Sequence, residues 1–177
     1  MRSGRLDEAI RIFRRVYLMN QSHSTQRQAA LYAGKCLYDR MQYEDAAQWL
    51  VRFIGLNEQK QGAAVAEAYL YLGRSQFAVG QLDEAAQSLY SALMAEPPSA
   101  LRADVSLTLA EVELERQQYS RAVGILDELA GGDLGGRQAE DLIVLTGRAY
   151  RWMGFPEQGA RYLKERLAVV NDPQSKA

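Results

Sequence analysis

The stretch GQLDEA at residues 80–85 recurs along the chain in four related forms. They are GRLDEA at 4–9, MQYEDA at 41–46, QQYSRA at 117–122 and GFPEQG at 154–159. The small residue that closes each copy stands at 9, 46, 85, 122 and 159, so the successive steps are 37, 39, 37 and 37 residues. A period in this range indicates an array of stacked supersecondary units.

Two further rows of residues keep a fixed distance from the closing small residue. Four residues after it stands a large apolar side chain: Phe13, Leu50, Leu89, Leu126 or Leu163. Twelve residues before it, in four of the units, stands Gly34, Gly73, Ala110 or Gly147. Small residues that face each other on two antiparallel helices let the backbones approach closely, and the large residue then packs into the adjoining groove. The pattern therefore predicts a pair of helices in each repeat.

The apolar periodicity predicts an all-α fold of about nine helices, because no strand-like alternation competes with it. We place the helices at residues 6–19, 24–40, 43–56, 62–79, 82–95, 99–117, 119–130, 137–153 and 156–170. Turn and linker compositions separate them, such as the two prolines at 97–98 and the glycine-rich stretch at 131–136.

The repeat resembles that of the tetratricopeptide family, whose consensus has Leu-Gly-x-x-Tyr on the first helix and Ala-x-x-x-Phe, then Pro, on the second. Matching residues are Leu72 with Gly73, Gly147 with Tyr150, Ala9 with Phe13, and Pro97. Gln76 and Glu113 depart from the pattern, since they stand where the family prefers Tyr. The resemblance covers nearly the whole chain.

This resemblance implies a right-handed α-solenoid of antiparallel helix pairs. We expect a single domain over residues 1–177, with an orphan second helix at 6–19 and repeats at about 24–56, 62–95, 99–130 and 137–170. We also expect the chain to be part of a longer repeat array, because a second helix stands first in it without a first helix of its own. Alternatively, the apolar edge of that helix pairs with another copy to form a homodimer, through Ile12, Phe13, Val16 and Tyr17.

The repeat is longer than the family norm. From one closing small residue to the next Gly or Ala the gaps are 25, 27, 25 and 25 residues, whereas a 34-residue repeat would leave about 22. The excess amounts to about one helical turn per repeat. In this respect the chain is similar to bacterial envelope proteins of the family, including the lipoprotein of the outer-membrane β-barrel assembly machine. That similarity implies a role in envelope assembly or export.

Composition narrows the classes of function. A net charge of −1 lacks the basic excess expected of a protein that binds nucleic acid. The longest apolar runs are too short to span a membrane. Residues 1–6 are polar and acidic residues follow at once, so we expect no signal peptide in this chain. The compartment stays open between bacterial periplasm and cytoplasm, since one cysteine permits no internal disulfide in either.

The chain also lacks the residue clusters that enzymes and metal sites need. His23 is the only histidine and is predicted to lie in a loop, where a solvated role is the better interpretation than that of a base or ligand. Cys36 has no neighbouring base to activate it and fits a small packing residue. The glycine-rich stretch 131–136 lacks the Gly-Lys-Ser/Thr ending of a phosphate loop. We therefore expect no catalytic residues, no metal and no cofactor.

The resemblance implies that the first helices of successive repeats line a concave groove. Carried over by register, the candidate groove residues are Lys35, Tyr38, Asp39, Glu67, Arg74, Phe77, Asp104, Glu111, Asp141, Arg148, Arg151 and Trp152. The groove would have an acidic edge, a mostly basic stripe and apolar steps between them. The chaperone type of carboxylate clamp is disfavoured, since Leu31 and Lys35 stand where it needs Lys and Asn.

These residues leave two interpretations of the groove open. In one, the charges only solvate an open surface and pair with each other, for example Glu67 with Arg74. In the other, the cations meet carboxylates of a bound peptide while Tyr38, Phe77 and Trp152 supply anchors. The leading hypothesis is a non-enzymatic scaffold that binds a protein or peptide. The alternative is an assembly module that docks through its N-terminal helix edge, onto another copy or the rest of a larger chain.

Overall fold

A computed structural model describes residues 2–19, 22–59, 61–132 and 134–170. The described part of the chain is helical, without a strand, and its helices are α1 (Arg2–Met19), α2 (His23–Asp39), α3 (Tyr43–Gly55), α4 (Ala63–Ala78), α5 (Leu82–Met94), α6 (Ser99–Glu115), α7 (Tyr119–Ala130), α8 (Gly136–Trp152) and α9 (Pro156–Val170). Their bounds agree with the sequence prediction to within about two residues for all but α1. The predicted all-α fold is confirmed.

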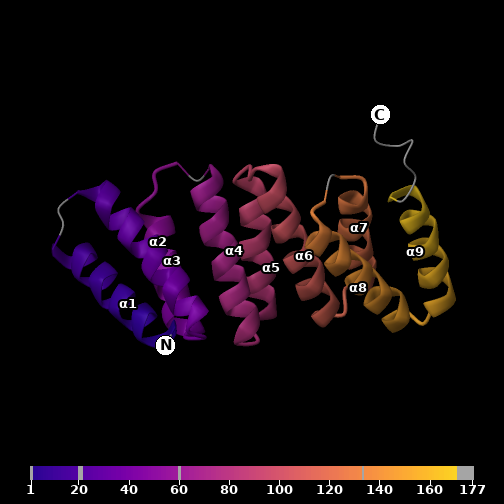
Figure 1. Cartoon of the computed structure of the whole chain (residues 1–177), viewed down its shortest axis with the longest axis horizontal. Coiled ribbons are helices and arrows are strands. Elements are labelled where there is room, and N and C mark those ends of the chain that lie inside the picture. Colours follow the sequence, from indigo (N-terminus) through magenta and orange to yellow (C-terminus); the bar gives the residue numbers. More distant parts are fainter. Residues whose placement is uncertain (1, 20–21, 60, 133, 171–177) are drawn as a thin grey trace. The chain divides into compact units, whose positions relative to one another are not determined.

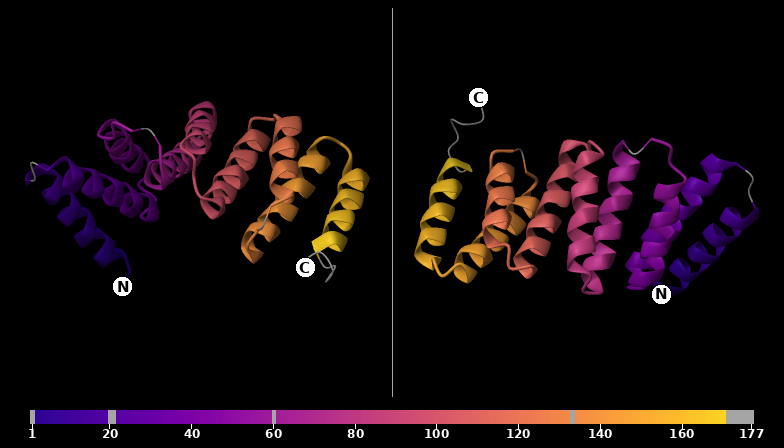
Figure 2. Two further views of the ribbon diagram at one scale, coloured as in Figure 1. Left: turned by 90° about the horizontal axis from the view of Figure 1, so that it is seen from above. Right: turned by 180° about the vertical axis from the view of Figure 1, so that it is seen from behind.

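The structure forms two compact units, and their boundary falls inside α6. Unit 1 covers Met1–Arg102 and holds α1 to α5 with the first turn of α6. Unit 2 covers Ala103–Ala177 and holds the rest of α6 with α7 to α9. Within each unit, successive helices run antiparallel (Figures 1 and 2).

The prediction that the first helix begins at residue 6 was wrong, because α1 begins at Arg2. In the other repeats the residue that opens the repeated stretch has a left-handed backbone, with φ of 61° at Met41, 79° at Gly80, 61° at Gln117 and 82° at Gly154. These residues terminate a preceding first helix. Gly4, in contrast, lies inside α1.

A recurring hydrogen bond builds the four turns. The backbone N–H of Gln42, Gln81, Gln118 and Phe155 donates to the carbonyl oxygen five residues earlier, at 2.8–2.9 Å. This bond, with the left-handed residue before the donor, is the Schellman arrangement that ends a helix and satisfies its last carbonyls. The turn fixes how each first helix folds back against its second helix.

The close helix approach predicted from the small residues is confirmed in unit 1. A Cβ atom on Gly34 would lie 2.8 Å from Cγ of Leu50, and one on Gly73 would lie 2.7 Å from Cγ of Leu89. Both leucines are fully buried. The glycines therefore create the space that the large side chain of the second helix fills.

In the last repeat of unit 2 the closest approach lies elsewhere. A Cβ atom on Gly147 would lie 3.9 Å from Leu163, which is an ordinary contact, whereas one on Gly159 would lie 2.6 Å from Cβ of Tyr150. The bulky Tyr150 occupies the place where α2 carries Leu37. The tight position has therefore moved from the first helix to the second.

Polar side chains form hydrogen bonds at the two positions where the sequence departs from the consensus tyrosine. In unit 1, Ser88 donates its hydroxyl to Oε1 of Gln76 at 2.7 Å. In unit 2, the Glu113 side chain has an exposed fraction of 0%, and Nη1 of Arg116 lies 3.0 Å from its Oε1. One unit thus holds a neutral pair at this position, and the other holds a charged pair.

Candidate functional site

The exposed face of the first helices in unit 1 centres on Lys35. Its Nζ on α2 lies 2.6 Å from Oε1 of Glu67 on α4. The same Nζ lies 5.9 Å from the ring centroid of Tyr32 and 5.3 Å from that of Tyr71. The ammonium group is therefore enclosed by one carboxylate and two aromatic faces, all of which favour its charged form.

The pKa of Lys35 reflects the balance of these surroundings. Burial, the largest single influence, lowers the pKa, but the hydrogen bond and charge of Glu67, with the further effects of Tyr71 and Tyr32, outweigh it and raise the pKa above its ordinary value. Lys35 is consequently a cation at any physiological pH.

Aromatic side chains continue from this enclosure across four helices. The ring of Tyr32 stacks on Phe13 of α1 at 5.6 Å between centroids. Tyr38 makes edge-to-face contacts with Tyr71 at 5.2 Å and with Tyr43 at 5.5 Å. Burial raises the pKa of Tyr38, against the opposing effect of the Arg74 charge. The Tyr32 side chain keeps an exposed fraction of 48%, so part of this aromatic surface is open to a partner.

The corresponding face of unit 2 centres on Arg148 of α8. Its guanidinium donates to Oε1 of Glu111 at 3.3 Å and to Oε1 of Glu115 at 2.9 Å, both on α6. The guanidinium carbon also lies 4.9 Å from the ring centroid of Trp152, which lies 6.0 Å from the ring of Tyr119. One arginine thus links two carboxylates and an exposed indole.

The remaining candidate groove residues have contacts of their own or differ in exposure. Asp104 on α6 accepts a hydrogen bond from Nε2 of Gln138 at 2.8 Å. Asp141 lies 3.9 Å from Arg137 on the same exposed helix surface. The others divide by exposure: Asp39 and Arg151 are exposed, while Arg74 and Phe77 are half-buried.

The structure bears on the first of the two interpretations of the groove, in which the charged residues pair with each other. Lys35 and Arg148 each join two first helices of their own unit, so a partner carboxylate would have to compete with Glu67, Glu111 or Glu115. Glu67 forms its ion pair with Lys35 of the preceding repeat.

The apolar steps expected in the groove are largely part of the core. Leu31, Leu70 and Leu107 are buried, whereas Val144 at the same repeat position is exposed. The aromatic surface around Lys35 includes two tyrosines that the register did not select, the exposed Tyr32 and the half-buried Tyr71. Tyr32 and Tyr71 stand 39 residues apart, the step between their repeats, and that coincidence is the signal that could have identified them.

The described residues hold no cluster of His, Cys, Asp and Glu that could bind a metal ion. His23 is exposed and is the first residue of α2. The prediction that it lies in a loop was therefore wrong by one residue. Cys36 is half-buried, and burial raises the pKa of its thiol, which makes it a poor nucleophile. These surroundings fit a packing role for the thiol.

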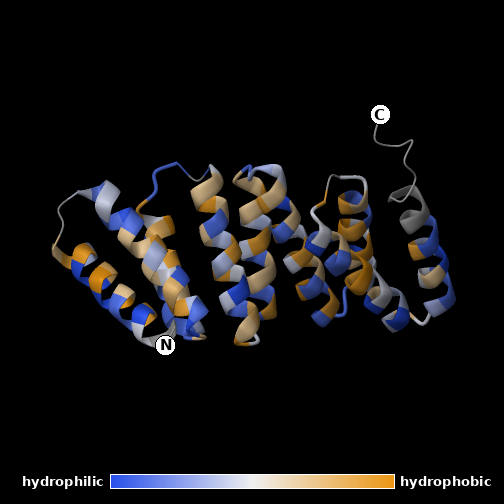
Figure 3. Ribbon diagram, in the orientation of Figure 1, coloured by the Kyte–Doolittle hydropathy of each residue, from blue (hydrophilic) through white to orange (hydrophobic). Residues whose placement is uncertain are grey.

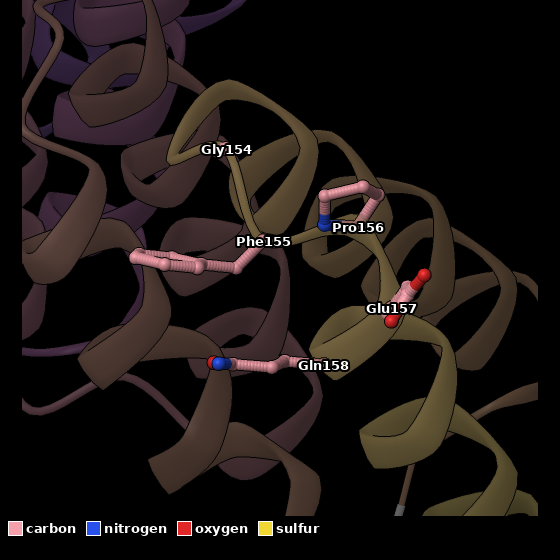
Figure 4. Close-up of a pocket in the computed structure, with 5 residues that line it drawn as sticks. All are labelled: Gly154, Phe155, Pro156, Glu157 and Gln158. Carbon is pink, nitrogen blue, oxygen red and sulfur yellow. The ribbon is translucent and has the colours of Figure 1, made fainter.

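A cavity of about 330 Å³ opens at the turn between α8 and α9. Five consecutive residues line it, from Gly154 to Gln158, and Phe155 and Gln158 extend to one side of the turn while Glu157 extends to the other (Figure 4). Glu157 is the one ionisable group among them.

None of the described helices combines the length and the apolar character needed to cross a bilayer. Paired helices with a repeated small–large contact and a repeated turn define a helical-repeat protein, whose exposed first-helix faces are the candidate sites.

Comparison with known proteins identifies the kind of repeat. A tetratricopeptide-repeat family model matches residues 76–143. The crystal structure of MamA is similar with 22% identity and a TM-score of 0.76, over 99% of this chain and 94% of that one. The TPR-like repeats of a Podosopora anserina protein assigned as a kinesin light chain are similar with 17% identity and a TM-score of 0.72, over 98% of this chain and 91% of that one.

A sequence search of curated proteins finds no match. At these identities the solved structures show the fold, and the family model over residues 76–143 supports the predicted tetratricopeptide-type repeat. Proteins of this family are in general non-enzymatic scaffolds for contacts between proteins.

Proposed function

We propose that the chain is a non-enzymatic scaffold that binds a peptide segment or helix of a partner protein on the exposed faces of its first helices. The observation that carries this proposal is the combination of exposed aromatic rings with fixed cations, Tyr32 beside Lys35 and Trp152 beside Arg148. Aromatic and arginine side chains are the residues that most often dominate the binding energy of protein interfaces.

The two faces favour a partner with both acidic and apolar side chains. Each cation already has a carboxylate partner within its unit, so its position is preset before a ligand arrives. The side chain of the cation therefore loses little further entropy when a partner carboxylate binds to it. We extend the proposal to a role in bacterial envelope assembly or export, because the long repeat period resembles that of bacterial envelope proteins of the tetratricopeptide family.

Charge reversal on these faces tests the proposal. We expect Arg74→Glu and Arg148→Glu to weaken capture of the physiological partner while the far-ultraviolet circular dichroism stays unchanged. Arg121→Glu on α7 is the matched control, because it reverses an exposed charge on a second helix. Partners captured with the full chain are identified by cross-linking mass spectrometry, and their contact sites are mapped onto α2, α4, α6 and α8.

Two results would contradict the proposal. One is a partner whose capture is unaffected by either reversal. The other is a set of cross-links that falls on the second helices alone. A partner with cross-links to the first helices and sensitivity to Arg148→Glu would support it.

A further inference from the structure

Ion pairs join the first helices of neighbouring repeats in both units. In unit 1, Nζ of Lys35 on α2 lies 2.6 Å from Oε1 of Glu67 on α4. In unit 2, Arg148 on α8 lies 3.3 Å from Oε1 of Glu111 and 2.9 Å from Oε1 of Glu115, both on α6. The same kind of contact therefore recurs on the exposed first-helix face of each unit.

The Lys35 pair spans two helices that touch each other little. α2 and α4 each pack along α3, and their contact with one another is much smaller. Figure 3 shows hydrophilic residues among the hydrophobic ones on both helices. Long side chains bridge the two helices on the exposed face, where Lys35 reaches Glu67 and Tyr38 meets the ring of Tyr71 at 5.2 Å. These side chains therefore contribute to the spacing between α2 and α4.

The ion pair and the tyrosine pair lie at different levels along the helices. α2 and α4 run in the same direction, because each is antiparallel to α3 (Figure 1). Lys35 precedes Tyr38 by three residues and Glu67 precedes Tyr71 by four, which is about one helical turn on each helix. The ion pair is therefore nearer the N-terminal ends of both helices. Its loss would leave the two tyrosines in contact as a pivot.

The ion pair is accessible from solvent. The side chains of Lys35 and Glu67 have exposed fractions of 26% and 33%. A pair with this exposure contributes modestly to stability, and dissolved ions weaken it. The pair can consequently open without unfolding of the unit, and the carboxylate of a bound partner can reach Lys35 in place of Glu67.

We propose that the pair of Lys35 and Glu67 is a latch between two repeats. In the free chain Glu67 occupies the ammonium group and holds the N-terminal halves of α2 and α4 together. A carboxylate of the partner exchanges with Glu67, and the two halves then separate about the contact of Tyr38 with Tyr71. This exchange rests on the proposed function, whereas the latch itself is a property of the free chain. Glu67 thus acts as an intramolecular competitor that couples partner binding to the spacing of the two helices.

Distances between spin labels test the latch in the full chain without a partner. Gln28→Cys on α2 and Ala64→Cys on α4 place the labels at exposed positions toward the N-terminal ends. Both changes are made in a Cys36→Ser background, so that the native free thiol is not labelled. Double electron–electron resonance measures the distance distribution between the labels. We expect Glu67→Gln to lengthen and broaden this distribution at low salt.

Salt provides a second readout of the same label pair. Rising sodium chloride should lengthen the distance in the chain that keeps Glu67, because ions screen the attraction between the two charges. The distance in Glu67→Gln should stay constant, since its pair is already broken. Glu84→Gln is the matched control, because it removes an exposed carboxylate from a second helix. It should change neither the distance nor its salt dependence, and unchanged circular dichroism shows that the variants fold.

A second pair of labels locates the pivot. Asp39→Cys and Ala78→Cys place it at the last residues of α2 and α4, beyond the tyrosine contact. If the helices separate about Tyr38 and Tyr71, this distance should change much less than the first one does.

A hexaglutamate peptide tests the exchange, with hexaserine at equal ionic strength as its control. Hexaglutamate should lengthen the distance between the labels at positions 28 and 64 in the chain that keeps Glu67, because its carboxylates compete for Lys35. Hexaserine should leave that distance unchanged.

Equal distances in the chain with Glu67 and in Glu67→Gln would exclude the latch. Widening of both label pairs together would also exclude it, since that result indicates general loosening. A lack of response to hexaglutamate would exclude the exchange. Any of these results leaves the proposed function intact if partner capture still depends on Arg148→Glu. Conversely, a working latch in a chain whose partners ignore the charge reversals would contradict the proposed function alone.

Discussion

Units 1 and 2 carry the same helix-pair repeat but build their exposed faces from different chemistry. Unit 1 places Lys35 between two tyrosine rings and a carboxylate, and its aromatic contacts extend over four helices. Unit 2 places Arg148 between two glutamates and one indole. The repeat therefore determines which positions lie next to each other on successive first helices, while the side chains at those positions determine what each face can bind.

The interiors of the two units differ in the same way. At one repeat position unit 1 pairs the half-buried Gln76 with the buried Ser88, and unit 2 pairs the buried Glu113 with the half-buried Arg116. At another, unit 1 needs a glycine on its first helix, and the last repeat of unit 2 needs one on its second. The shared backbone geometry tolerates several local solutions, and their energetic costs should differ measurably.

The largest expected difference in stability between the units comes from breaking these two polar pairs. Arg116→Met leaves the carboxylate of Glu113 buried without this cation, and we expect it to lower the free energy of unfolding by about 3–5 kcal/mol. Ser88→Ala, which removes the corresponding neutral bond in unit 1, should cost about 1 kcal/mol. Denaturant unfolding, with amide hydrogen exchange to assign the effect to a unit, measures both.

The double variant Glu113→Gln with Arg116→Met is the control for this comparison. It removes both charges, so it should recover most of the lost stability. If Arg116→Met proves no more harmful than Ser88→Ala, the ion pair is not what holds this part of unit 2 together.

A smaller difference is expected at the first-helix glycines. Gly73→Ala places a methyl group 2.7 Å from the buried Cγ of Leu89, so we expect a loss of about 1–3 kcal/mol through overpacking. Gly147→Ala meets its nearest atom at 3.9 Å, so the helix should instead gain about 0.5–1 kcal/mol from the lower entropy of alanine. Thermal melts of the two variants should shift in opposite directions, and equal shifts would show that the two repeats pack alike.

The smallest expected effect on stability comes from substitutions at the left-handed turn residues. It should be the same in both units, because the conformation of each turn depends on neighbouring residues in the sequence. Met41 and Gln117 hold left-handed backbones of φ 61° each, which cost a non-glycine residue energy that glycine avoids. We expect Met41→Gly and Gln117→Gly each to raise the free energy of unfolding by about 0.5–1 kcal/mol after the entropy of glycine is counted. The reverse changes, Gly80→Ala and Gly154→Ala, should destabilise. A gain in one unit alone would mean that the turns are not equivalent.

Much of the fold was predictable because its signals are local. Helix periodicity depends on residues three and four apart, and the turn depends on one residue that accepts a left-handed backbone. The helix bounds and the contacts of Gly34 and Gly73 follow from such signals. The start of α1 at Arg2 did not, because the same stretch forms a turn only where a preceding first helix ends in it.

The candidate site was predictable in its residues but not in its contacts. Register alone places Lys35, Glu67, Arg148 and Glu111 on first helices. Register does not say that Lys35 reaches Glu67, 32 residues away, or that Arg148 reaches Glu111, 37 residues away. It also missed Tyr32 and Tyr71, because neither residue falls in the rows of positions that the register selected.

The sequence by itself determined the repeat, the helix pairs and the small residues that let them approach, since each is written in a fixed spacing along the chain. Only the tertiary structure decided that Lys35 and Arg148 are engaged with carboxylates, that Gly159 replaces Gly147 at the tight contact, and that Tyr17 packs on Trp49 of α3. The physical reason is that such contacts depend on how far each helix is rotated and tilted against its neighbour and on which rotamer each long side chain adopts. Those quantities result from the packing of all the side chains together, and no single spacing in the sequence encodes them.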